Sequence, residues 1–106
     1  MWSSSAYSIR TVTGVATDIG TFQLVQGKVV SAEIRDGRAW LGFGTGLKGD
    51  FSALIAPDDL RTYHAMGVDP RGYAGKTVLV RGIVQNLYGP VIAVATPVQV
   101  QVIEGP

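Results

Sequence analysis

The sequence contains no cysteine and little charge. Without cysteine the chain can form neither disulfides nor thiolate metal sites, and thiol catalysis is excluded. Charged residues make up 16% of the 106 residues, and nine Lys and Arg against eight Asp and Glu give a formal net charge of +1. A protein held to nucleic acid by charge alone is expected to be strongly basic. This balance therefore excludes a purely electrostatic nucleic-acid binder.

Long apolar runs are also missing. No stretch approaches the roughly 18 apolar residues that a membrane-spanning helix needs. The N-terminus does not show a charged region followed by an apolar one, the pattern of a secretory signal. The chain is nevertheless 46% hydrophobic, which is enough to build one core in a domain of this size. We therefore expect a single soluble globular domain without a membrane span.

The first 21 residues differ in composition from the rest. They include four serines and four threonines, and only the stretch from Tyr7 to Val12 suggests a short strand. We predict an N-terminal arm or linker over residues 1–21, with Trp2 as its anchor, and one domain over residues 22–106. Such an arm would fit a chain cut from a longer protein.

A hairpin around Asp36-Gly37 is the most sharply defined element. This dipeptide suits a two-residue type I′ turn, in which both central residues have positive φ. The turn fixes the register of the two strands that flank it. The predicted cross-strand pairs are Arg35 with Arg38, Ile34 with Ala39, Glu33 with Trp40, Ala32 with Leu41, Ser31 with Gly42, and Val30 with Phe43.

This register sorts the side chains by polarity. The pairs Ile34/Ala39, Ala32/Leu41 and Val30/Phe43 fall on one face of the hairpin. Trp40 falls on the other face together with the polar pairs. We therefore expect the apolar pairs to face the core and the indole of Trp40 to face outward.

The rest of the chain predicts three further strands and one helix. Asp50 to Ile55 alternates apolar and polar residues as a strand does, and Pro57 with two following aspartates opens a helix that stops at Gly67. Leu60, Tyr63 and Met66 give that helix an apolar stripe. The remaining predicted strands are 77–85, 91–95 and a half-buried tail, 97–103, in which Val98, Val100 and Val102 point inward.

Three strands, a helix and two strands is the element order of the OB-fold. We therefore predict an all-β protein with one short helix, a five-stranded Greek-key barrel with the helix between strands 3 and 4. The competing SH3-like barrel usually carries only a single 3₁₀ turn at that place, so the helix favours the OB-fold.

The sequence also resembles a known family. Residues 20–55 and 69–104 are similar to the OB-like domain found C-terminal to a thermonuclease-type (staphylococcal nuclease-like) domain in some bacterial nuclease-related proteins. The resemblance rests on these motifs in order: G-x-V-V from Gly27, Phe43-Gly44, Asp50-Phe51, Gly75-Lys76 with Val80-Arg81-Gly82, and Gly89-Pro90. It implies an accessory OB-fold module that contacts nucleic acid, with catalysis in the neighbouring domain.

The residues themselves do not indicate an active site. Metal-dependent nuclease chemistry needs clustered carboxylates and a nearby cation. Asp58 and Asp59 fit helix-start positions, Asp36 fits a turn, and Asp69 precedes Pro70. The only histidine, His64, falls in the predicted helix without a second metal-ligating or catalytic partner at a suitable spacing. We therefore expect no intrinsic nuclease activity, no metal and no cofactor.

A glycine-rich stretch, 42–46, has the composition of a phosphate-binding loop. A dinucleotide loop must open a helix, however, so that the helix N-terminus meets the pyrophosphate. This stretch leads into a strand, which favours a flexible inter-strand loop instead.

The predicted binding surface is the outer face of the second and third barrel strands, where OB-folds stack bases on aromatic side chains. Trp40 falls on this face near two arginines, while Glu33 stands opposite the indole and opposes a phosphate. The candidate nucleic-acid-binding residues are Trp40, Arg35, Arg38, Lys48, Arg81 and Tyr88.

Two interpretations of this surface remain open from the sequence. In the first, it binds single-stranded DNA or RNA weakly and with little sequence preference. In the second, Trp40 is buried under the arm or in a subunit contact, and the domain is a protein-interaction or self-association module that packs against a thermonuclease-like domain of the same parent protein. The near-zero net charge favours the second, and the cluster of tryptophan and arginines favours the first.

Overall fold

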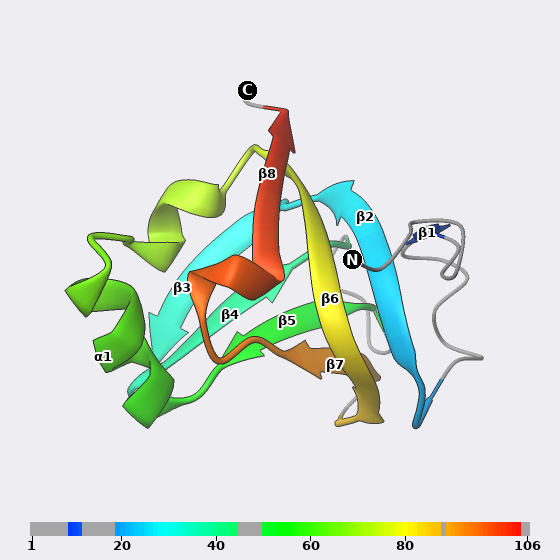
Figure 1. Cartoon of the computed structure of the whole chain (residues 1–106), viewed down its shortest axis with the longest axis horizontal. Coiled ribbons are helices and arrows are strands. Elements are labelled where there is room, and N and C mark those ends of the chain that lie inside the picture. The colour runs from blue at the N-terminus through cyan, green and yellow to red at the C-terminus, as the bar shows by residue number, and fades with distance from the viewer. Residues whose placement is uncertain (1–8, 12–18, 45–49, 88, 105–106) are drawn as a thin grey trace, which may run out of the picture.

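Strands dominate the computed structural model, which describes residues 9–11, 19–44, 50–87 and 89–104 (Figure 1). Among these residues one α-helix separates the fifth strand from the sixth. The elements in chain order are β1 (Ile9–Thr11), β2 (Phe22–Lys28), β3 (Ser31–Arg35), β4 (Arg38–Gly42), β5 (Ser52–Ile55), α1 (Pro57–Ala65), the 3₁₀ turn η3 (Pro70–Tyr73), β6 (Thr77–Asn86), β7 (Pro90–Ala93), the 3₁₀ turn η4 (Pro97–Gln99) and β8 (Val100–Glu104).

The strands form one curved sheet in the order β1-β2-β6-β7-β5-β4-β3, and β8 adds to β6. β2 and β3 follow each other directly in the chain, yet β2 pairs with β6 and β3 with β4 at the far end of the sheet. They are therefore two halves of one long bent strand. With β4, β5, β6 and β7, it gives the five strands and the strand order of an OB-fold, with α1 between the third and fourth, as predicted. Among the described residues, the hydrogen-bonded ladders do not close into a ring.

The long first strand bends at Val29 and Val30. The amide of Val29 donates a 2.8 Å hydrogen bond to the carbonyl of Lys76, and its carbonyl accepts one of 2.8 Å from the amide of Gly75, just before β6. The amide of Val30 instead donates to the carbonyl of Gly42 of β4, at 2.8 Å. The change of partner shifts the inward-facing set of side chains by one residue. Val29 is buried, and Val30 is 59% exposed. The prediction that Val30 faces the core opposite Phe43 is therefore wrong, because the sequence does not show where the strand changes partner.

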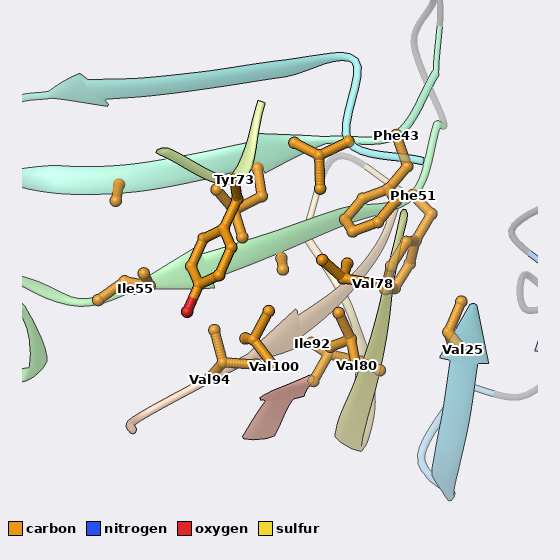
Figure 2. Packing of buried hydrophobic residues seen from close by; sticks show 14 of the residues in the cluster. Val25, Phe43, Phe51, Ile55, Tyr73, Val78, Val80, Ile92, Val94 and Val100 are labelled. Carbon is orange, nitrogen blue, oxygen red and sulfur yellow. The ribbon is translucent and has the colours of Figure 1, made fainter. Parts of the chain in front are cut away.

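The inner face of the sheet carries a core of β-branched and aromatic side chains (Figure 2). Phe43 and Phe51 pack against each other with ring centroids 5.0 Å apart. The hydroxyl of Tyr63 in α1 donates a buried hydrogen bond of 3.0 Å to the carbonyl of Val94, just after β7. This hydrogen bond holds α1 against the end of β7.

The helix matches its predicted bounds but not its whole apolar stripe. It begins at Pro57 and stops before Gly67, whose φ of 74° ends the helical conformation. Tyr63 is buried and Leu60 packs partly against the core, but Met66 is exposed. A stripe of three was predicted, and the helix uses two of its members.

The C-terminal tail also departs from its predicted pattern. Pro97 begins the 3₁₀ turn η4, so that strand β8 starts only at Val100. Val100 is buried, whereas Val98 and Val102 are exposed. The predicted alternation therefore holds at Val100 alone of the three valines. Val98 departs from it because it lies in the turn, and Val102, on the same face of β8 as Val100, is exposed further along the strand.

Part of the predicted arm pairs with the sheet. β1 lies within the predicted strand 7–12 and runs parallel to β2, with Ile9 opposite Leu24. None of the helices in the described ranges has the length and apolar character needed to cross a membrane.

Candidate nucleic-acid interface

The outward face of the hairpin is built by the turn at Asp36 and Gly37. Their φ angles of 53° and 76° are both positive, as a type I′ turn requires. The observed register pairs Arg35 with Arg38 and Glu33 with Trp40. The predicted register of the β3–β4 ladder is confirmed at every pair from Ser31/Gly42 to Arg35/Arg38.

Trp40 lies on this outer face in the middle of three strands. Glu33 of β3 is opposite it on one side, and Leu54 of β5 is opposite it on the other. The residues that flank Trp40 along β4, Ala39 and Leu41, are buried in the core, whereas Trp40 is itself only half-buried and belongs to no core cluster. The indole therefore has both an apolar support and a surface open to solvent.

The charges around the indole are mixed. The Nε of Arg35 lies 3.6 Å from a carboxylate oxygen of Glu33, and both side chains are more than half exposed. Arg38 stands opposite Arg35 and forms no ion pair within the described part of the chain. An exposed ion pair of this kind contributes little to stability but offsets the charge of one arginine. Among the residues that the structure describes, Arg38 is therefore the cation beside Trp40 that is free to meet a phosphate.

Arg81 does not belong to this group. It lies on β6 opposite Leu24, and β7 and β5 separate β6 from β4 in the sheet. At about 4.8 Å per strand, three steps place it roughly 14 Å from the strand of Trp40. Its Nη2 donates a 3.4 Å hydrogen bond to Gln101, and its Nε is buried without a partner among the described residues.

The two other predicted binding residues, Lys48 and Tyr88, fall outside the described residues. The interface that the structure describes thus consists of Trp40, Arg35 and Arg38, with Arg81 apart. The sequence interpretation did not include two residues of β5, Leu54 and Ser52, which extend the outer face beside Trp40 and Gly42. The alternation of 50–55 indicates which residues of β5 face outward, but not their register against β4, because the connection is long and glycine-rich.

The carboxylates and the histidine lie where local structure uses them. Asp58 and Asp59 are in the first turn of α1, and His64 is exposed near its end. Asp69 accepts hydrogen bonds from the backbone and side chain of Arg71, which hold the pKa of this exposed carboxyl below its usual value. No three metal-ligating side chains come together within the described ranges.

No protein-family model and no curated protein sequence matches the chain. Solved structures are similar in fold. Aspartyl-tRNA synthetase from Entamoeba histolytica gives a TM-score of 0.70 at 11% identity over 96% of this chain. Asparaginyl-tRNA synthetase from Pyrococcus horikoshii gives 0.60 at 17% identity over 92% of it. The chain spans only 22% and 23% of these two synthetases.

A third similar structure has the size of this chain. OBody AM1L10, solved in complex with hen egg-white lysozyme, gives a TM-score of 0.61 at 18% identity, over 90% of this chain and 92% of the OBody. At such identities the likeness shows a shared OB-fold and nothing finer. It agrees with the strand order seen here.

Proposed function

We propose that the chain is a non-catalytic OB-fold module that binds single-stranded nucleic acid weakly and with little sequence preference. The observation that carries the proposal is the half-buried Trp40 on the outer sheet face, with Arg38 free beside it. Every base has a π-face, so one exposed indole can stack on any of them, and a neighbouring guanidinium can neutralise a phosphate. Two of the similar structures are tRNA synthetases, enzymes whose substrate is a nucleic acid.

Weak binding follows from the charges of the same face. Glu33 stands opposite Trp40 and pairs with Arg35, so the face offers one unpaired cation among the residues described. Few phosphates are then neutralised, few counterions are released, and the affinity depends only modestly on salt.

We further propose that the parent protein is nuclease-related and that any catalysis takes place in a neighbouring domain. The sequence motifs from Gly27 to Gly89-Pro90 support this context. Four of the described carboxylates support a non-catalytic role, because Asp58 and Asp59 lie at the helix start, Asp36 in the hairpin turn and Asp69 at the η3 turn.

Tryptophan fluorescence tests the proposal. In a Trp2→Phe background Trp40 is the only fluorescent indole, and titration with an oligo-dT or oligo-U strand should quench it at tens of micromolar. The quenching should weaken as salt rises. In the native background, Trp40→Ala should weaken binding about fivefold or more, measured by fluorescence anisotropy of a labelled strand, because one stacked base is worth about 1–3 kcal/mol.

Arg81→Ala provides a matched control, since it removes a cation from another part of the sheet. It should bind within about twofold of the native chain. Unchanged affinity of the Trp40→Ala variant, with its fold intact by circular dichroism, would contradict the proposed interface.

A protein ligand on the same face is the second candidate function. Leu54 beside Trp40 and the Glu33–Arg35 ion pair favour it. An apolar surface whose charges neutralise each other is better suited to binding a protein than to binding phosphates. One similar structure, OBody AM1L10, is bound to a protein. No response to any single strand, with a salt-independent complex between this domain and a thermonuclease-type domain, would favour this candidate.

A further inference from the structure

Strand β3 forms an end of the sheet and has a free edge. It pairs with β4 on one side, and no strand of the described chain pairs with the other. A two-residue turn makes Arg35/Arg38 a hydrogen-bonded pair, so the hydrogen-bonded pairs of β3 continue at Glu33 and Ser31. The amides and carbonyls of Ala32 and Ile34 therefore point away from β4, to the free edge.

The charged side chains of β3, Glu33 and Arg35, pair with each other, which reduces the protection that charges give to an edge strand. The strand contains no proline and no lysine, the residues that commonly guard edge strands. The 3₁₀ turn η3 lies close to β3, but its backbone hydrogen bonds stay within residues 69–76 or go to Val29. Ile34 is two residues from Ala32 and so lies on the same, inward face of β3, yet it is 40% exposed. An apolar side chain beside unpaired backbone groups is the pattern of a strand that accepts another strand.

The charges on the outer face of β3 alternate in sign, with Glu33 followed by Arg35. In an antiparallel pair of two copies centred on Glu33, Ser31 faces Arg35 of the second copy, and Ala32 faces Ile34. The exposed isoleucine of each copy then packs on the alanine of the other. Each Glu33 has its own Arg35 at 3.6 Å and gains the second copy's Arg35 as a diagonal neighbour. The two Glu33 carboxylates face each other across the axis, which by itself is unfavourable, and the two Arg35 guanidinium groups offset their repulsion.

We propose that β3 pairs antiparallel with β3 of a second copy of this chain, giving a two-fold symmetric dimer with one continuous sheet. Four backbone hydrogen bonds form, two at each Ala32/Ile34 pair. The arrangement is isologous, so it closes at two chains and does not propagate.

The dimer also extends the outer face, a consequence that rests on the proposed function. The two Trp40 residues then lie in one row across the axis, with Glu33 of each copy between them. Three strand spacings separate them by roughly 14 Å. One strand of nucleic acid could then contact both indoles.

Analytical ultracentrifugation of the whole chain without nucleic acid tests the dimer. The native chain should sediment as a dimer in equilibrium with monomer at tens to hundreds of micromolar. Ile34→Lys should weaken the dimer at least tenfold, because it places a charge at the shared edge. Ile83→Lys is the matched control, since Ile83 is 48% exposed on β6 and away from this edge. It should leave the association unchanged.

Charge reversal provides a second test. Glu33→Arg and Arg35→Glu should each weaken the dimer, and the double variant should restore it. A native chain that is monomeric at 200 µM, or equal dimerisation of the Ile34→Lys and Ile83→Lys variants, would overturn the proposal. Trp40→Ala should weaken nucleic-acid binding and keep the dimer, so failure of one proposal is distinguishable from failure of the other.

Discussion

Single residues at unusual backbone positions decide the geometry of the candidate interface. Asp36 and Gly37 both adopt positive φ, which sets the two-residue loop and so turns Trp40 outward. A loop longer by one residue would shift the pairing of β3 with β4 by one residue, and side chains that now face outward would face the core. The outward position of the indole is therefore a property of two turn residues rather than of Trp40.

At Gly82 the backbone of β6 lies close to the core side chain of Ile92. A Cβ built at this position would lie 2.6 Å from Cγ2 of Ile92, closer than real contacts allow. We expect Gly82→Ala to destabilise the protein by about 1–3 kcal/mol, the usual effect of overpacking a core. Gly72→Ala is the control, because its Cβ would meet nothing within 4 Å. Urea unfolding measures both, and an equal midpoint for the two variants would contradict the packing argument.

Arg38 allows a prediction about salt. If this guanidinium contacts one phosphate, Arg38→Ala should reduce the slope of log affinity against log salt by about 0.7 on a single strand. Arg61→Ala removes the same charge from the exposed surface of α1 and should leave the slope unchanged. Anisotropy titrations between 50 and 200 mM salt would show the difference. Equal slopes for the two variants would indicate that Arg38 does not touch the ligand.

At the scale of elements, α1 is joined to the sheet by one buried polar contact as well as by apolar packing. The hydroxyl of Tyr63 bonds the carbonyl of Val94, which follows β7. At the other end of the helix, Pro57 lies 3.9 Å from the position of a Cβ at Gly37 in the hairpin turn. The helix therefore contacts both the hairpin that carries Trp40 and the end of β7.

Tyr63→Phe should remove this hydrogen bond and leave the buried carbonyl of Val94 without that partner. We expect a loss of about 1–2 kcal/mol in the free energy of unfolding. Tyr73→Phe is a matched control: Tyr73 is also buried, and its hydroxyl has no hydrogen bond among the described residues. It should cost less than about 0.5 kcal/mol. Comparable losses in the two variants would mean that the hydrogen bond contributes little.

For the whole molecule, the buried tyrosines predict a loss of stability in alkali. Burial, followed by the influence of Tyr73 and Asp59, raises the pKa of Tyr63 well above its ordinary value of 10.0, and burial raises the pKa of Tyr73 as well. In the unfolded chain these phenols lose their protons near pH 10, whereas in the folded chain they stay protonated. The stabilisation is therefore complete below pH 10 and decreases as the pH rises above it.

Thermal unfolding between pH 8 and 11 would measure this decrease. Tyr63→Phe should show a shallower fall of the melting temperature above pH 10 than the native chain, because one of the ionising groups is gone. An identical fall in the two proteins would show that Tyr63 is not responsible.

Much of the fold could be predicted because its signals are local. The Asp36-Gly37 dipeptide defines a turn and with it a register, and Pro57 and Gly67 mark the two ends of a helix. No strand was predicted over residues 22–28, where the structure has β2. The bend at Val29 also could not be predicted, because it depends on which strands the two halves of the long strand meet.

The sequence by itself determined the element order, the β3–β4 pairing and the outward position of Trp40, because turn chemistry and strand alternation act over a few neighbouring residues. Tertiary structure decided the rest. The pairing of β5 with β4 placed Leu54 beside the indole. The pairings of β2 with β6 and of β5 with β7 join residues far apart in the chain, and they left Arg81 on another part of the sheet. The exposure of Val30 and Ile34 also follows from which strands β3 meets. Such long-range contacts depend on how all the strands share one core, which no local pattern records.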